Sequence, residues 1–476
     1  MHGAKNIRKN FIYNSVYQLI AIAVPLVTTP YLSRVLGAEG IGEYAYAYSI
    51  AYYFTLLIKL GINTYGSREI ACCRDDKIRT SKTFWELYTF QFVLALFFSF
   101  IYIVYSVFVS KNKSVSLILG IFVVSAGIDI TWFFGGIEEF KLIAIRDLII
   151  KVLSTLGIFA VVKTEMDTWK YALLLSIGFI GSPIFLWPSL YKYVNWYRPT
   201  LRGILRHIKP NLLLFLPTIA VSLYKTMDKI MLGTFSSTVE VGYYESSEKI
   251  IQVPMALITS LGTVMQPRMS NLLSRGEDKD KLEYIMKKSF NLAMFMSSLV
   301  GFGIMMEAGT FVPWFYGDGY EKCIILYKIL LPSCLFLAFA NVIRTQYLIP
   351  NKKDISYIIS LFAGAGINLL VNILLIGKYK STGVAIGTLT AEITVCVIQI
   401  FLVKKQISMF ENVMSSLCYI VAGLAMYFMG AGINLNIRPV EEMIIKAGVG
   451  VGIYIIILGI LLLLKDSLEK WRIKKQ

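Results

Sequence analysis

The feature that most constrains this chain is a series of long apolar segments that recurs from one end of the sequence to the other. A bilayer core of about 30 Å requires about 20 largely apolar residues per spanning helix. The 476 residues are 56% hydrophobic and 16% charged, with a mean hydropathy of +0.63. We expect an all-α integral membrane protein with about fourteen transmembrane helices, over residues 11–32, 41–60, 83–108, 115–134, 147–162, 171–190, 210–233, 250–267, 289–308, 323–346, 355–376, 383–403, 412–432 and 441–464.

The basic residues between these segments indicate the orientation of the chain. Cytoplasmic loops of membrane proteins hold an excess of Lys and Arg. Of the 47 Lys and Arg, thirty lie in the two terminal segments and alternate loops, ten lie in the other loops, and seven lie within the spans. This bias predicts that both termini are cytoplasmic. Attraction to anionic lipid headgroups accounts for the net charge of +17, so we expect no nucleic acid as a partner.

The loops and motifs argue against an enzyme. The loops on the outer side are too short to form a catalytic domain, and no G-x-x-x-x-G-K-[ST] phosphate loop is present. Asp278-Lys279-Asp280 matches the D-x-D pattern of some glycosyltransferases, but three residues in a charged loop match often by chance. The six cysteines have no C-x-x-C spacing, and His2 and His207 are the only histidines. We therefore expect no catalytic residue, no metal and no cofactor.

A weak internal repeat predicts how the helices are organised. Gly42 and Arg68 in the first half are 26 residues apart, and so are Gly242 and Arg268 in the second half. Repeats of six helices have the same orientation in the membrane and form two parallel bundles that rock around a central substrate site. We expect one bundle in residues 1–205, a second in residues 206–405, and two additional helices with a basic tail in residues 406–476.

Charged residues inside the spans are costly and therefore mark candidate functional positions. The basic ones are Lys59, Lys151, Lys225, Lys229, Lys328, Arg344 and Lys446, and the clearest acids are Asp129, Asp228 and Glu392. Four of the basic residues, Lys59, Lys328, Arg344 and Lys446, lie near helix ends, where a long side chain can also reach the headgroups. Lys151 and Glu392 lie deeper, and we expect them to face protein or water.

Three charges share one face of the seventh expected helix. Lys225, Asp228 and Lys229 have the spacing i, i+3 and i+4. A local ion pair explains this pattern, and so does a hydrated cavity whose spare positive charge attracts an anionic group. Aromatic clusters such as Tyr44, Tyr46, Tyr48, Tyr52 and Tyr53 could stack on sugar rings, although aromatics at membrane surfaces are common.

Several motifs resemble the polysaccharide exporters that flip lipid-linked O-antigen or capsule repeat units. This family belongs to the superfamily that also contains multidrug and toxic compound extruders. The resemblance covers the first twelve expected helices and is carried by residues 31–37 (YLSRVLG), 40–44 (GIGEY), 67–71 (SREIA), 129–141 (DITWFFGGIEEFK), 228–233 (DKIMLG) and 241–268 (VGYY to PR).

The resemblance implies a flippase that moves polyprenyl pyrophosphate-linked oligosaccharides from the inner to the outer leaflet of a bacterial cytoplasmic membrane. It also implies the extruder-like fold, alternating access, and membrane lipids and other polysaccharide assembly proteins as partners. One alternative is a proton- or sodium-coupled multidrug extruder, although such pumps generally use an acid early in the first bundle and residues 11–32 offer only Asn14 and Gln18. A glycan polymerase or ligase is a second alternative, which the short outer loops disfavour.

We therefore expect a set of mostly basic residues to guide the pyrophosphate. These residues are Arg34, Arg68, Lys151, Lys225, Asp228, Lys229, Arg268 and Arg344. Arg34 is included mainly because of the resemblance. Asp129 and Glu392 are candidates for coupling transport to an ion, and pairing of either acid with a lysine is the alternative.

Overall fold

The computed structural model describes residues 23–433, 435 and 437–475, and leaves out the side chains of Tyr224, Lys225, Asp466 and residues 468–475. The first twelve residues of the first expected helix, including Asn14 and Gln18, therefore lie outside the described residues. Within the described residues the chain is all-helical and has no strand. By their contacts, the residues form two compact units, one ending at Gly242 and one beginning at Tyr243.

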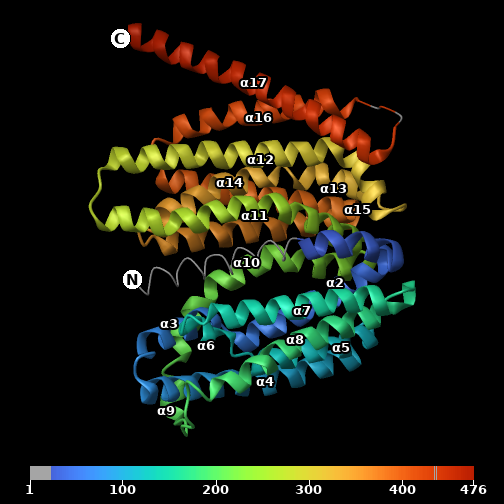
Figure 1. Ribbon diagram of the computed structural model, residues 1–476, viewed down its shortest axis with the longest axis vertical. Coiled ribbons are helices and arrows are strands. Elements are labelled where there is room, and N and C mark those ends of the chain that lie inside the picture. The colour runs from blue at the N-terminus through green and yellow to red at the C-terminus, as the bar shows by residue number, and fades with distance from the viewer. Residues whose placement is uncertain (1–22, 434, 436, 476) are drawn as a thin grey trace. The chain divides into compact units, whose positions relative to one another are not determined.

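The N-terminal unit begins with helical residues 23–35 and continues through mostly long helices (Figure 1). The elements are α2 (Gly37–Lys59), α3 (Ile62–Cys73), α4 (Lys77–Phe108), α5 (Lys113–Ile128), α6 (Thr131–Gly136), α7 (Phe140–Val161), η1 (Glu165–Asp167), α8 (Thr168–Leu190), α9 (Leu201–Leu205), α10 (Ile208–Phe235) and the start of α11 (Thr238–Ser274). In this unit α5 packs against α2, α4 and α8, and α7 packs against α8.

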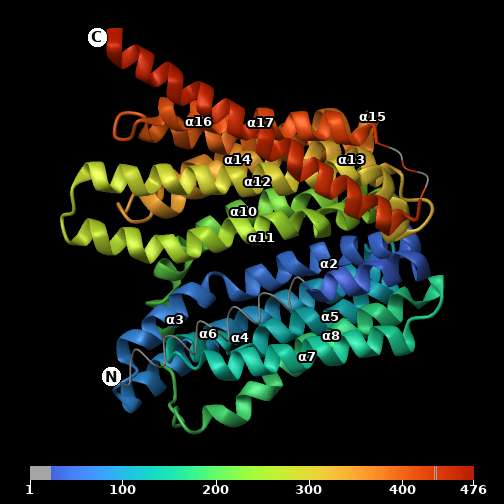
Figure 2. The ribbon, with the colours of Figure 1, turned by 45° about the horizontal axis from the view of Figure 1, so that its top comes forward.

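The second unit contains the rest of α11 and the helices that follow it (Figure 2). These are α12 (Lys279–Tyr316), α13 (Lys322–Leu330), α14 (Ser333–Ile343), the π-helical η2 (Arg344–Leu348), α15 (Asp354–Val403), α16 (Met409–Ala431) and α17 (Pro439–Lys475). Here α16 packs against both α12 and α17, and α14 packs against α12 and α15.

The composition of these helices fits a lipid environment. Among the described residues, ten helical segments are long and apolar enough to cross a membrane. Many large apolar side chains on them are exposed, such as Phe97 and Phe100 on α4 and Ile456 and Leu463 on α17. Exposed apolar surface on this scale is unusual in a soluble protein and is expected where lipid tails are the solvent. The chain is a multi-pass integral membrane protein.

The expected helices differ from the observed ones mainly at their ends. The non-helical Lys380 lies inside α15 and separates two of the expected spans. The fifth expected helix begins at Phe140 rather than at residue 147, and the fourth ends at Ile128 instead of continuing to residue 134. The number fourteen stays a prediction. The short α5 and the charged α7 are not among the ten apolar segments, α15 counts as one segment for two expected spans, and most of the first expected span lies outside the described residues.

Candidate functional site

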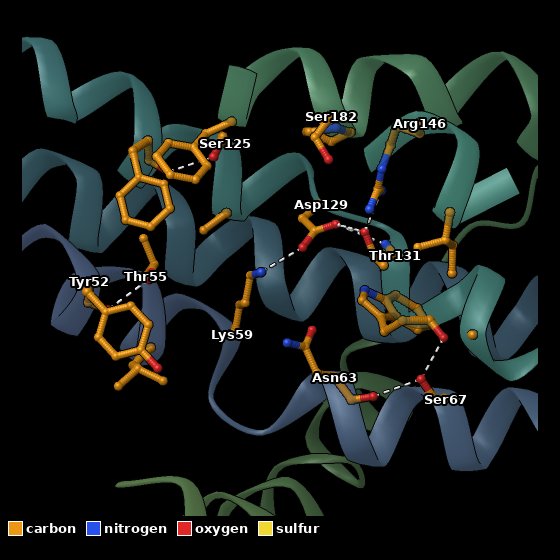
Figure 3. Close-up of a pocket in the computed structure, with 18 of the residues that line it drawn as sticks. Tyr52, Thr55, Lys59, Asn63, Ser67, Ser125, Asp129, Thr131, Arg146 and Ser182 are labelled. Carbon is orange, nitrogen blue, oxygen red and sulfur yellow. Dashed lines mark hydrogen bonds and ion pairs between the residues drawn. The ribbon is translucent and has the colours of Figure 1, made fainter. Parts of the chain in front are cut away.

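A cavity of about 720 Å³ lies within the N-terminal unit (Figure 3). Residues from α2, α3, α5, α6, α7, α8 and α10 line it. The volume is in the range of about 300–1,000 Å³ that is typical of small-molecule sites in proteins. The charged residues on the wall are Lys59, Asp129 and Arg146.

Two interrupted helices place charged groups at the cavity. α2 ends at Lys59, and the next two residues, Leu60 and Gly61, both have positive φ, at 37° and 86°. At Gly61 a Cβ would also lie 2.6 Å from the carbonyl oxygen of Asn211, so a side chain there is disfavoured twice. In the second interruption α5 ends at Ile128, and extended Asp129 precedes the short helix α6. Interrupted helices of this kind frame substrate sites in membrane transporters.

The charged groups form one continuous network. The Nζ atom of Lys59 lies 2.6 Å from Oδ2 of Asp129. The other oxygen, Oδ1, accepts hydrogen bonds from the backbone N–H of Thr131 at 2.9 Å and from its hydroxyl at 2.5 Å. The hydroxyl oxygen of Thr131 in turn accepts from Nη1 of Arg146 at 2.9 Å, and Arg146 also binds the Asp147 carboxylate. Each carboxylate in the network is therefore paired.

A buried glutamine supports the break between α5 and α6. The Gln91 side chain donates to the backbone carbonyls of Ala126 at 2.6 Å and Asp129 at 2.9 Å, and its Oε1 accepts from the Trp132 indole at 3.0 Å. A helix end leaves carbonyl groups without helical partners, and these must be satisfied when they are buried. Gln91 satisfies two of them and holds Trp132 in place.

The other part of the wall is aromatic. The Tyr48 ring stacks on Phe122 with centroids 5.1 Å apart and on Phe179 at 6.0 Å, and Tyr52 follows at 6.4 Å. Stacked rings present flat, weakly polar surface to a ligand. The cavity thus has a charged part, where the cations outnumber the carboxylate among the lining residues, and an aromatic part.

The structure brings only one residue of the predicted site to this cavity, Asp129. Arg34 and Arg68 are exposed, Lys151 is partly buried on α7, and none of these three lines the wall. On α10, Asp228 is fully buried and Lys229 partly buried, while the side chain of Lys225 lies outside the described part of the chain.

Three further predicted residues belong to the second unit. Arg268 is exposed on α11. Arg344 starts the π-helical segment and donates to the side chains of Asn341 and Tyr357. Glu392 is buried on α15, as we expected for an acid in the middle of a span.

Two lysines that could have reached the headgroups are paired with acids instead. Lys59 is paired in the cavity, and Lys446 is only 3% exposed and lies 2.5 Å from Glu442, one turn earlier on α17. Lys328, by contrast, is exposed.

Arg146 is the main residue of the cavity that the sequence did not reveal. An expected helix that begins at residue 147 leaves Arg146 among the thirty basic residues of the cytoplasmic segments. Its side chain is 5% exposed, almost two turns into α7. The sequence offered little signal for this pairing, because residues i and i+1 of a helix do not normally face each other and Asp147 is the immediate neighbour.

Comparisons with known proteins agree with this architecture. The inward closed conformation of the lipid II flippase MurJ superimposes with a TM-score of 0.75 at 16% identity, covering 96% of this chain and all of the other. An inward-facing multidrug resistance transporter of the MATE family in the MOP superfamily gives 0.62 at 13% identity, covering 83% of this chain and 96% of the other. At such identities these matches show the shared fold, that of flippases and multidrug transporters.

The sequence comparisons extend the match to a family. A putative O-antigen transporter of Escherichia coli (strain K12) is 24% identical over 413 residues, which cover 84% of this chain and 97% of the relative. A second putative O-antigen transporter, from Shigella dysenteriae, is 23% identical over 84% of this chain and its own full length. The family model described as polysaccharide biosynthesis protein matches residues 7–273, more than half of the chain. The chain therefore belongs to this polysaccharide biosynthesis family, whose resemblance the motifs had indicated.

Proposed function

We propose that this protein is a flippase that moves polyprenyl pyrophosphate-linked oligosaccharide repeat units from the inner to the outer leaflet of a bacterial cytoplasmic membrane. The family, the putative O-antigen transporters and the shared fold of a lipid II flippase all support transport of a lipid-linked glycan. The observation that carries the proposal is the cavity of the N-terminal unit, which combines paired cations with an aromatic wall.

The chemistry of the cavity suits such a substrate. An oligosaccharide has many hydroxyl groups whose transfer into hydrocarbon is unfavourable without replacement hydrogen bonds. Asn63, Ser67, Ser125 and Ser182 supply polar groups on the wall, and Tyr48 and Tyr52 supply ring faces. Sugar and phosphate can therefore stay hydrogen-bonded in the cavity while the lipid tail remains in the bilayer.

Lys59 and Arg146 are the cations that would attract the pyrophosphate in this cavity. Each is already paired with a carboxylate, and Thr131 links the two pairs. An incoming diphosphate competes for these cations, so its binding would loosen the contact between α2 and the α5–α6 break. We infer that the ion pair between Lys59 and Asp129 re-forms after the substrate leaves, which restores the contact between α2 and the α5–α6 break.

Transport by alternating access requires the two parallel bundles that the internal repeat predicts, residues 1–205 and 206–405. In that arrangement Arg34, Arg68, Arg268 and Arg344 would guide the pyrophosphate near the openings of the pathway, and Lys151, Lys225, Asp228 and Lys229 would do so along it. Proton or sodium coupling through Glu392 or Asp129 belongs to the same proposal. The helices after residue 405 lie outside the predicted repeat.

Deletion of the gene followed by analysis of lipid-linked glycans tests the proposal. We expect a polyprenyl pyrophosphate-linked repeat unit to accumulate on the inner leaflet, while surface polysaccharide is lost. Wild-type protein should restore export, whereas an Arg146→Gln variant should restore it poorly. Arg198→Gln, which removes the same charge at an exposed position, is the matched control. Altered drug sensitivity without accumulation of a glycan precursor would instead support the extruder.

A further inference from the structure

A second cavity, of about 480 Å³, lies in the N-terminal unit where the ends of α3, α4, α9 and α10 meet. It shares no lining residue with the first cavity. Its wall includes three cations, Arg79 and Lys82 from the first two turns of α4 and Arg206 from the turn between α9 and α10. Glu69 is the one carboxylate that lines it.

Two of these cations are available to a ligand. Among the described residues neither Arg79 nor Lys82 forms an ion pair, and the Lys82 ammonium lies over the ring of Tyr197, whose centroid is 6.0 Å away. Arg79 is exposed and Lys82 is partly buried. Their spacing of i and i+3 puts both side chains on the same face of α4. The cavity therefore has spare positive charge on one wall.

A buried polar cluster holds another part of the wall. Nη2 of Arg206 lies 2.6 Å from Oε2 of Glu86, and Nε2 of His207 lies 3.3 Å from the same oxygen. Nδ1 of His207 lies 2.8 Å from the hydroxyl of Tyr65. Glu86 is fully buried and His207 is 2% exposed, whereas half of the Arg206 side chain remains accessible. The cluster thus fixes one edge of the Arg206 guanidinium and leaves the rest of it exposed.

A glycine in α9 allows the Glu86 carboxylate to lie close to the backbone of that helix. Oε1 of Glu86 receives no hydrogen bond and occupies the space that a Cβ on Gly203 of α9 would need. A larger residue at position 203 would displace Glu86 and, with it, Arg206. A fixed arginine loses less side-chain entropy when it binds a ligand than a mobile one does. The ion pair with Glu86 therefore lowers the entropic cost of binding a ligand at Arg206.

We propose that this second cavity is a binding site for a phosphate group, presented either by a soluble phosphate compound or by a phospholipid headgroup. Two arginines and one lysine line it, and Thr83, which also lines it, carries a hydroxyl donor. Guanidinium groups match the oxygens of phosphate with paired, charge-assisted hydrogen bonds. The site is separate from the cavity on which the proposed function rests, and it binds phosphate whether or not a glycan is transported.

The test is a binding measurement on the full-length protein carrying Arg146→Gln, so that the first cavity contributes little. In nanodiscs of phosphatidylcholine, inorganic pyrophosphate is titrated at low salt and followed by calorimetry. In a second arm, native mass spectrometry counts the phosphatidylglycerol retained from mixed nanodiscs. The first arm reports a soluble ligand and the second a lipid headgroup, so the arm that responds identifies the source.

The decisive comparison is between two double variants with equal loss of charge. Arg79→Gln/Lys82→Gln removes the two available cations, and Lys77→Gln/Arg198→Gln removes two exposed cations that do not line the cavity and form no ion pair among the described residues. We expect the first variant to bind at least tenfold more weakly in one arm or both, and the control to stay within about twofold. The swap Arg79→Lys/Lys82→Arg should retain most of the binding, which shows that the loss is not a folding defect. Equal binding by the two double variants in both arms overturns the proposal.

Discussion

Lys59 and Asp129 form an ion pair at the N-terminal cavity, with 2.6 Å between Nζ and Oδ2. Their side chains are 26% and 16% exposed, so neither is fully hydrated. Desolvation offsets much of the attraction in such a pair, and the larger effect appears when one partner is removed and the other is left alone. The pair therefore adds little to the overall free energy of unfolding. Its main effect is to favour one conformation at the end of α2.

This argument predicts a specific pattern in a double-mutant cycle. Lys59→Gln and Asp129→Asn should each destabilise the purified protein by about 1–3 kcal/mol, because each leaves a partly buried charge without its partner. The double variant should lose less than the sum of the two. Thermal unfolding in detergent measures all four proteins. Additive losses would show that the two side chains do not interact.

Arg146 leads to a second prediction, because its guanidinium bridges two groups. It donates to Thr131 and to Asp147 in different directions. A lysine at this position keeps the charge but cannot reproduce that fork. We expect Arg146→Lys to lower the rate of glycan export by about tenfold, equivalent to about 1.4 kcal/mol, at unchanged protein level. Arg198→Lys is the control. Equal export rates for both variants would show that the Arg146 guanidinium has no role in transport.

The residues of the cavity were only partly predictable. Asp129 was identified from its position within an apolar segment, because a charge there is costly whatever the fold. Its partner Lys59 is 70 residues away, and such pairing depends on tertiary packing that no local pattern encodes. Arg146 was missed because the start of α7 was placed too late. Lys446 and Glu442, in contrast, have the i, i+4 spacing from which their pairing follows.

At the scale of the elements, two glycines from the predicted repeat are packed backbone to backbone. A Cβ on Gly42 of α2 would collide with the carbonyl of Thr238, and a Cβ on Gly242 of α11 would collide with the carbonyl of Ala38. Only glycine allows helices to approach so closely, and small residues serve this purpose in membrane helices generally. The repeat had matched these positions without indicating that they touch each other.

Substitution of either glycine should therefore be costly. We expect Gly42→Ala and Gly242→Ala each to destabilise the protein by about 1–3 kcal/mol, since the added methyl group forces the helices apart. Gly181→Ala on α8 is the control, because nothing lies within 4 Å of a Cβ at that position. The control should be neutral or slightly stabilising through helix propensity. Melting temperatures that fall equally in all three variants would contradict this packing.

Element type was predicted better than element boundaries. Apolar length identifies a membrane helix regardless of its partners, so the helical segments were found. The second expected helix ended at residue 60, within one residue of the observed end of α2 at Lys59. The break at Asp129 was not predicted, because it depends on tertiary contacts such as those of Gln91 with the backbone carbonyls of Ala126 and Asp129. That break places Asp129 in the cavity, so the missed boundary belongs to the candidate site.

At the scale of the whole molecule, orientation in the membrane stays a prediction from the basic residues, and a native cysteine can test it. Cys72 is exposed at the end of α3, in a segment expected on the cytoplasmic side, while four of the other five cysteines are buried. A membrane-impermeant maleimide should label Cys72 only after the cells are permeabilised. Cys72→Ser should abolish that signal. Labelling of Cys72 in intact cells would show that this segment is on the outer side and would contradict the predicted orientation.

The most direct test of the central claim is a flipping assay with purified protein in liposomes. A fluorescent polyprenyl pyrophosphate-linked oligosaccharide is placed in both leaflets, and its exposure to an impermeant quencher is followed over time. We predict that wild-type protein and Arg198→Gln bring the inner pool to the quencher much faster than protein-free liposomes, and that Arg146→Gln is slower by at least about tenfold. If wild-type protein gives no acceleration, or if Arg146→Gln matches Arg198→Gln, this cavity is not the path of a lipid-linked glycan.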